Sequence, residues 1–324
     1  MNDQNILIVG GAGYIGSHIN KMLHKAGYRT VILDNLSNGN KKTVKYGEFI
    51  EGDLGDKQLL DRIFKEYPIK AVMHFAAFID VGESISHPIK YYQNNVTNTL
   101  SLLETMIKNA CMTFIFSSTA AIFGHPHSLP MTEEHPCHPI NPYGETKWMI
   151  EKILRSCDTA YGLKSCCLRY FNAAGGDPEG EINNYQKQST NLIPLLLKNL
   201  KSGTGALTVF GSDYPTKDGT CIRDYIHIDD LGTAHIKGLE QLLSGKPSSY
   251  YNLGNGNGYT VREVIHAAEK VTGKRAHINE GPRRQGDPPQ LIADSKKAYK
   301  DLNWKPQYPA LETMIQHAWI ALDS

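Results

Sequence analysis

The stretch Ile6-Leu7-Ile8-Val9-Gly10-Gly11-Ala12-Gly13-Tyr14-Ile15-Gly16 decides the fold. Residues 6–9 predict a buried strand, and the apolar spacing of residues 15–26, followed by Gly27, predicts a helix that ends there. Glycines at 10, 13 and 16 permit a sharp turn, a close approach to a pyrophosphate and tight packing of the helix on the sheet. The first amides of that helix can bind phosphate. The stretch therefore predicts a dinucleotide site, with an ordinary glycine turn as the alternative.

The alternation of strand and helix patterns continues through the first 170 residues. We expect further strands at residues 30–33, 71–75, 113–117 and 165–170. This βαβ rhythm predicts an α/β fold with a doubly wound parallel sheet of the Rossmann type. The polar segment 172–189 then interrupts it. We therefore expect one domain over residues 1–172 and a smaller C-terminal α+β domain over 173–324. This boundary leaves open that some segments of 173–324 pack in the first domain.

Sequence patterns also predict the elements of the second domain. We expect helices at residues 261–272 and 311–320, and short strands at 207–210 and 250–253.

Composition narrows the class of protein. The 324 residues include 34 basic and 33 acidic side chains, which does not suggest a nucleic-acid partner. No apolar run is long enough to cross a bilayer and residues 1–5 do not resemble a signal peptide, so we expect a cytoplasmic protein with no membrane partner. Six cysteines show no CxxC pair and no metal-ligand spacing with the thirteen histidines, so we expect reduced thiols and no metal site.

Two acidic residues fit a cofactor role. Asp34 ends the second predicted strand at the distance where a carboxylate binds the adenine ribose hydroxyls of NAD. It would repel the extra phosphate of NADP, so the sequence favours NAD, although a helix-cap or turn aspartate is the alternative. Asp53 is a candidate for binding the adenine amine.

Catalytic candidates lie in Pro142-Tyr143-Gly144-Glu145-Thr146-Lys147, which begins a helix predicted to continue to about Arg155. Tyr143 and Lys147 are four residues apart on one helix face, so their side chains can meet. A nearby ammonium and a positive nicotinamide ring both favour the phenolate, which makes Tyr143 a usable general base. An exposed helix pair is the alternative.

Ser117-Ser118-Thr119, at the end of the fourth predicted strand, adds hydroxyl groups to this site. Thr119 is our candidate to bind the hydroxyl being oxidised and to pass its proton to Tyr143, with Ser118 as the rival. No acidic residue follows that could protonate a leaving hydroxyl. Dehydration is therefore disfavoured.

Longer motifs connect these residues to a known family. Those motifs are His74-Phe75-Ala76-Ala77, Val81-Gly82-Glu83-Ser84, Tyr91-Tyr92-Gln93-Asn94-Asn95, Leu168-Arg169-Tyr170-Phe171-Asn172 and Gly219-Thr220-Cys221-Ile222-Arg223-Asp224-Tyr225-Ile226-His227. Over nearly its whole length the chain resembles the UDP-glucose 4-epimerases, which belong to the extended short-chain dehydrogenase/reductase family.

The resemblance implies an activity. In that family NAD stays bound while the tyrosine removes the O4 proton and hydride leaves C4. The resulting 4-keto sugar rotates about its bond to the diphosphate and presents its other face before hydride returns. It implies an NAD-dependent isomerase of galactose metabolism that interconverts UDP-glucose and UDP-galactose. The alternatives are an epimerase for a UDP-pentose or UDP-uronate, and an NAD-binding sensor without turnover.

The resemblance also implies site residues. Residues 1–172 would then bind NAD, and residues 173–324 mainly the UDP-sugar. The full set predicted to bind NAD is Gly10, Gly13, Tyr14, Ile15, Gly16, Asp34, Asn35, Asp53, Leu54, Phe75, Ala76, Asn94, Ser117, Tyr143, Lys147 and Tyr170. The set implied for the UDP-sugar is Thr119, Tyr143, Asn172, Asn191, Leu192, Phe210, Arg223, Tyr225, Arg284, Asp287 and Leu291. Within the second set, the arginines would clamp the diphosphate and Phe210 and Tyr225 would flank the uridine.

Three positions depart from many relatives. Thr119 stands in place of serine and keeps the hydroxyl, whereas Ile79 replaces a lysine near the cofactor. Leu291 lies where some relatives restricted to simple hexoses have tyrosine, which suggests a pocket wide enough for N-acetylated sugars (UDP-GlcNAc and UDP-GalNAc). Relatives form homodimers, here expected through the helices that follow Pro88 and Pro142.

Overall fold

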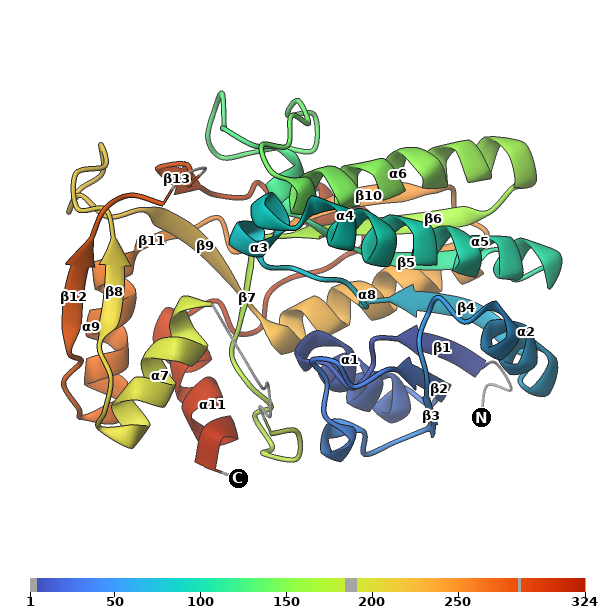
Figure 1. Ribbon diagram of the computed structural model, residues 1–324, viewed down its shortest axis with the longest axis horizontal. Coiled ribbons are helices and arrows are strands. Elements are labelled where there is room, and N and C mark those ends of the chain that lie inside the picture. The colour runs from blue at the N-terminus through green and yellow to red at the C-terminus, as the bar shows by residue number, and fades with distance from the viewer. Residues whose placement is uncertain (1–4, 184–190, 285–286, 324) are drawn as a thin grey trace.

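A seven-stranded parallel sheet forms the centre of the molecule (Figure 1). The computed structural model describes residues 5–183, 191–284 and 287–323. The strand order β10-β6-β5-β4-β1-β2-β3 contains the Rossmann order, with its switch point between β1 and β4. The strands are β1 (Asn5–Val9), β2 (Arg29–Asp34), β3 (Glu48–Glu51), β4 (Ile69–His74), β5 (Thr113–Thr119), β6 (Lys164–Tyr170) and β10 (Ser249–Leu253). The predicted doubly wound α/β fold is confirmed.

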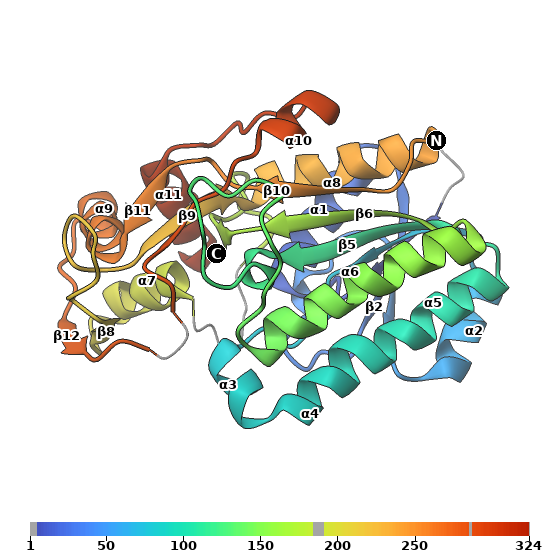
Figure 2. The same cartoon turned by 90° about the horizontal axis from the view of Figure 1, so that it is seen from above.

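Helices cover both faces of this sheet, as the view from above shows for one of them (Figure 2). Apolar side chains of α2, α5 and α6 pack on one face in a cluster that includes Leu60, Leu102 and Leu154. Those of α1 and α8 pack on the other, with Ile19 and Leu231. The helices of this unit are α1 (Tyr14–Lys25), η1 (Lys41–Thr43), α2 (Lys57–Glu66), α3 (Val81–Ser86), α4 (Pro88–Tyr91), the π-helical η2 (Tyr92–Thr97), α5 (Asn98–Lys108), η3 (Ala120–Ile122), α6 (Pro142–Tyr161), α8 (Ile228–Leu243) and α10 (Lys296–Asp301).

A second, smaller group of elements lies beside the carboxyl ends of the central strands (Figure 1). It has its own apolar core around Leu196, Val264 and Met314. One small sheet has the order β11-β9-β13 with β7 also paired to β9, and another pairs β12 with β8. The elements are β7 (Asn172–Ala174), α7 (Leu192–Ser202), β8 (Leu207–Phe210), β9 (Ile222–His227), β11 (Gly258–Thr260), α9 (Val261–Thr272), β12 (Ile278–Gly281), β13 (Gln290–Leu291) and α11 (Leu311–Asp323).

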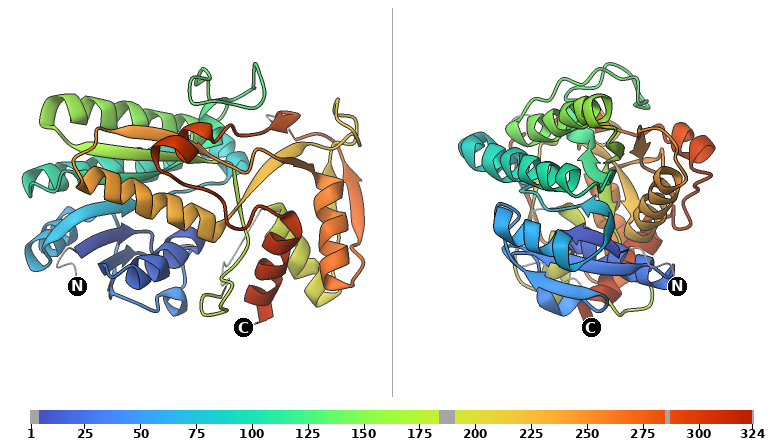
Figure 3. Two further views of the ribbon diagram at one scale, coloured as in Figure 1. Left: turned by 180° about the vertical axis from the view of Figure 1, so that it is seen from behind. Right: turned by 90° about the vertical axis from the view of Figure 1, so that its right-hand side faces the viewer.

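Two strands differ from the sequence prediction. Residues 250–253 were expected in the smaller domain, but β10 extends the central sheet, where Tyr250 pairs with Cys167 of β6 (Figure 3). Strand β3 was not predicted, because its short Glu-Phe-Ile-Glu run at the sheet edge lacks a clear apolar pattern. As a result, Ser117-Ser118-Thr119 ends the fifth strand of the chain and not the fourth.

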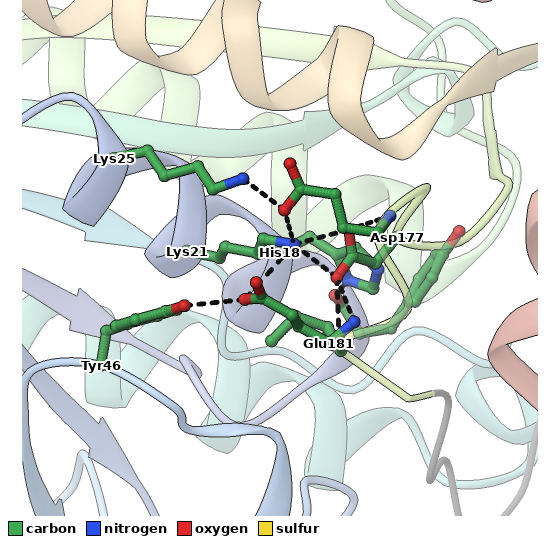
Figure 4. A network of polar contacts seen from close by, with 9 residues as sticks. His18, Lys21, Lys25, Tyr46, Asp177 and Glu181 are labelled. Carbon is green, nitrogen blue, oxygen red and sulfur yellow. Dashed lines mark hydrogen bonds and ion pairs between the residues drawn. The ribbon is translucent and has the colours of Figure 1, made fainter. Parts of the chain in front are cut away.

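The segment that follows β7 is fastened to α1 by a buried ion pair (Figure 4). Lys21 Nζ lies 2.7 and 2.6 Å from the two carboxylate oxygens of Asp177. One of those oxygens also accepts the backbone amides of Glu181 and Ile182. Tyr14 adds a hydrogen bond of 2.8 Å to the carbonyl of Gly175. Of the polar loop predicted at 172–189, residues 184–189 lie outside the described part of the chain.

Candidate active site

The glycine loop packs directly against the end of β4. Gly10 has φ +82°, and a Cβ there would lie 2.5 Å from the amide nitrogen of Ala76. A Cβ on Gly16 would lie 2.3 Å from the carbonyl oxygen of Gly10. Neither position tolerates a side chain, so the backbone stays accessible for a ligand.

An open cleft lies beside this loop, where the ends of β1, β2 and β4 meet. Predicted cofactor residues that line it are Gly10, Gly13, Asp34, Asn35, Asp53, Leu54, Phe75, Ala76 and Asn94. The sequence analysis missed other lining residues, among them Ser37, Asn38, Gly39 and Phe78. They follow strands β2 and β4 in loops, which lack the periodic pattern that marks a strand or helix.

The wall of the cleft favours NAD over NADP. Asp34 accepts the backbone amides of Ala12 and Leu36 at 2.9 and 2.8 Å, so its carboxylate is fixed beside the glycine loop. Burial raises the pKa of Asp34 above its ordinary value, and these two hydrogen bonds offset only part of that rise. Within the described chain, no lysine or arginine lines the cleft to balance a 2′-phosphate. Asn35 reaches the neighbouring loop with a hydrogen bond of 2.7 Å to Asp53.

Tyr143 lies in the first turn of α6, which Asn141 caps by accepting the amide of Gly144. Its hydroxyl lies near the side-chain hydroxyl of Thr119 at the end of β5, which lowers the pKa of the phenol. Burial acts in the opposite direction and raises the pKa of Tyr143. The structure therefore brings together the predicted base and the predicted hydroxyl.

Lys147 lies one turn further along α6 in a drier environment. Its Nζ donates a 2.8 Å hydrogen bond to the carbonyl of Ser117 and lies 4.9 Å from the ring centre of Phe116. We expected the ammonium to meet the phenol of Tyr143, whereas the hydrogen bond that the structure gives it goes to the strand. Burial lowers the pKa of Lys147 to about 7.

The two serines before Thr119 point to different partners. Ser117 accepts a hydrogen bond from the phenol of Tyr170, which is buried in β6. Ser118 was the rival of Thr119, but its hydroxyl donates to Glu151 at 2.6 Å in a fully buried position. Ser118 is therefore paired with Glu151, two turns along α6 from Tyr143, whereas Thr119 is the hydroxyl near Tyr143.

The π-helical turn η2 connects the cleft to α6. Asn94 lines the cleft and donates to Asn95 at 2.9 Å. Asn95 contacts both the backbone of Phe78 and the hydroxyl of Thr146. A wide turn at this point is typical of a functional site.

A second cluster of predicted residues lies in the smaller group of elements. Arg223 Nη2 and Arg284 Nε lie 3.5 and 2.9 Å from the carboxylate of Asp287. The guanidinium of Arg284 also lies 5.1 Å from the ring centre of Phe210. Phe210 is 39% exposed and Arg284 57%. One exposed aromatic face and two cations suit a nucleoside diphosphate.

The remaining predicted substrate residues are more scattered. Tyr225 is 4% exposed in the core of the smaller unit, so only Phe210 offers an open ring to a base, contrary to our expectation for the pair. Asn172 pairs with Tyr225 in register, and Asn191 and Leu192 begin α7. Leu291 pairs with Arg223 and packs against a cluster that includes Ala120 and Phe171. It therefore lies between Arg223 and the turn that follows Thr119.

Comparison with known proteins agrees with this geometry. The model of the NAD dependent epimerase/dehydratase family matches residues 6–254. The chain belongs to this family. A UDP-glucose 4-epimerase of Halalkalibacterium halodurans is 48% identical over 97% of this chain and 94% of its own length.

Solved structures give the same family. A UDP-glucose 4-epimerase of Brucella ovis in complex with NAD has a TM-score of 0.95 and 43% identity, covering 98% of each chain. A UDP-Glc/GlcNAc 4-epimerase of Campylobacter jejuni has a TM-score of 0.85 and 41% identity, covering 99% of each chain.

Other features of this family member bear on the remaining expectations. Within residues 5–183, 191–284 and 287–323, no three His, Cys, Asp or Glu side chains are grouped to bind a metal ion. No helix of that same part is both long and apolar enough to span a membrane. The six cysteines are all free thiols.

Proposed function

We propose that this chain interconverts UDP-glucose and UDP-galactose by inverting C4 of the sugar, with NAD held throughout the cycle. The observation that supports this most is the meeting of Thr119 and Tyr143 at the start of α6, which Asn95 connects to the dinucleotide cleft, with the Arg223–Asp287 cluster on the adjoining unit. A nucleotide bound to that cluster would present its sugar toward Leu291 and the turn after Thr119.

Each residue then has a distinct task. Tyr143 removes the proton from O4, and the hydroxyl of Thr119 stabilises the phenolate by donating to it. Lys147, in its protonated form, supplies a positive charge next to β5. Bound NAD supplies a hydride acceptor and donor for C4, so the reaction needs no net oxidant. Gly10, Gly13, Asp34 and Asn94 would hold it in the cleft.

We also propose that the pocket accepts UDP-N-acetylhexosamines. Leu291 is partly exposed and lies between Arg223 and the turn after Thr119, where a sugar joined to the diphosphate would lie. A leucine there leaves more room than a tyrosine. Further, we propose a cytoplasmic homodimer, formed through the helices that follow Pro88 and Pro142.

The decisive experiment is turnover of UDP-galactose by the pure protein with no added NAD, followed by appearance of UDP-glucose. Wild type should convert it, and Tyr143→Phe should lose roughly 100-fold or more in kcat because its base is gone, with bound NAD unchanged. Conversion of UDP-pentoses or UDP-uronates alone would identify another epimerase. No turnover on any UDP-sugar, with NAD bound, would identify a sensor.

A further inference from the structure

Three residues of α6 contact three consecutive residues of β5. Tyr143, Lys147 and Glu151 are spaced by four and so share one helix face. Tyr143 lies near Thr119, and Lys147 donates to the carbonyl of Ser117 at 2.8 Å. Glu151 accepts a 2.6 Å hydrogen bond from the hydroxyl of Ser118. The first two contacts hold the reacting groups, and the third has no part in the proposed chemistry.

Glu151 is itself held rigidly. Arg169 donates from Nε and Nη2 to its two oxygens at 3.0 and 2.6 Å, and both side chains are 4% exposed. Arg169 lies on β6 directly opposite Ser118, so the ion pair spans from the sheet to the helix. The rings of Tyr250 and Phe123 lie 4.4 and 5.4 Å from its guanidinium. Both charges are therefore fixed in a single geometry.

Such a pair does not need to add stability. A buried ion pair loses so much hydration that apolar residues of the same volume often stabilise a protein equally well. What it supplies here is a fixed distance between α6 and the end of β5. A displacement of about 1 Å at a catalytic group can reduce the rate about 100-fold.

We propose that Glu151 and Arg169 are positioning residues that lock Ser118, and so hold Thr119 and Ser117 on either side of it against Tyr143 and Lys147. The inference rests on the proposed function and adds a second row of residues behind the reacting groups. Glu151 and Arg169 belong to neither predicted ligand-binding set and act through Ser118.

Loosening Ser118 has a defined chemical consequence. Burial raises the pKa of Tyr143 and the nearby Thr119 hydroxyl lowers it, so moving that hydroxyl away leaves the pKa higher. The other titratable group near the phenol is Tyr170 on β6; Lys147 follows one turn along α6 and has His74 of β4 near it. Substituting Ser118 or Glu151 replaces none of these three residues. The rise of activity with pH should therefore move to higher pH.

The first test compares Ser118→Ala and Glu151→Gln with wild type in kcat and KM for UDP-galactose across pH. Ser118→Ala keeps the Glu151–Arg169 pair and so remains informative if Glu151→Gln folds poorly. Both should lower kcat roughly 10- to 100-fold with little change in KM, and shift the rising limb to higher pH. The double variant should lose no more than the worse single one, because one contact is removed twice. Lys21→Met breaks the other buried pair and controls for lost stability, so its pH profile should match wild type.

The second test needs no turnover. Titrating the phenolate absorption of each NAD-loaded protein against its Tyr143→Phe counterpart isolates the pKa of Tyr143, which should be higher in both variants than in wild type. Lower thermal stability with an unshifted titration and an unshifted pH profile would overturn the positioning role. A shifted titration in a protein that converts no UDP-sugar would retain the positioning role and reject the proposed function.

Discussion

Tyr143 and Lys147 share a helix face but not an environment. The phenol is partly exposed and lies near Thr119, whereas the ammonium is buried against β5. Desolvation lowers the pKa of Lys147 to about 7, so its amine is only partly protonated near neutral pH. The spacing of Tyr143 and Lys147 predicted that they share a helix face. Which atoms they contact depends on the position of β5 beside α6, which that spacing does not reveal.

Leu291 is the residue that we expect to set the sugar range. Leu291→Tyr should lower kcat/KM for UDP-N-acetylgalactosamine roughly 10-fold or more, because a pocket that is too small by one methyl group already costs a factor of this order. Activity on UDP-galactose should stay within about 2-fold of wild type. Rates on both sugars, measured with Leu291→Met as the size-matched control, would check this, and an equal effect of tyrosine on the two sugars would contradict it.

At the scale of elements, local signals predicted more than long-range ones. The strand–loop–helix unit at β1 and α1 and the bounds of α9 follow from periodicity and glycine stops. Helix α6 continues past the expected Arg155 to Tyr161, where Gly162 at φ +77° ends it. The place of β10 was not predictable, because pairing with β6 depends on the path of the chain and not on its own residues. Glu151 of α6 was missed for the same reason, since its partners Ser118 and Arg169 lie on strands β5 and β6.

The ion pair of α1 with the segment after β7 predicts a specific stability loss. Burial alone would lower the pKa of Lys21 and raise that of Asp177. Their hydrogen bonds outweigh burial, so the pKa of Lys21 is raised and that of Asp177 is lowered. Lys21→Met leaves a buried carboxylate unpaired, which should cost roughly 3 kcal/mol at pH 7. Lys25→Met breaks a more exposed pair with Glu179 and should cost clearly less than Lys21→Met.

The same pair gives a direction with pH. A lowered pKa of Asp177 stabilises the fold above the ordinary aspartate pKa of about 4, and this contribution is lost as the pH falls through the folded-state value. A raised pKa of Lys21 stabilises below about pH 10 and is lost above the folded-state value. Thermal melting at several pH values should therefore show wild type and Lys21→Met converging below about pH 4. A constant difference down to pH 2 would contradict the assignment.

At the scale of the whole molecule, the site depends on two units that the chain crosses repeatedly. Tyr170 ends β6 opposite Thr119, and only Phe171 separates it from Asn172 of β7 in the smaller unit. The chain later returns through α8 and β10 to the central sheet. This crossing explains why a single sequence boundary at residue 172 separates the predicted ligand sets better than it separates the packed cores.

The outer helices of the larger unit predict how two copies associate. Ile89 of α4 is 71% exposed and Leu100 of α5 is 41% exposed, on the helical segment that follows Pro88 and beside α6 (Figure 2). Pairing these helices between copies would bury such side chains, at about 25 cal/mol for each Å² removed from water. Sedimentation at micromolar concentration should give a dimer for wild type, and Ile89→Glu with Leu100→Glu should give monomers, because charges cannot enter that apolar contact unpaired. Ile278→Glu alters a comparably exposed residue of β12 and should leave the dimer intact. A monomeric wild type at the same concentration would rule out this mode of association.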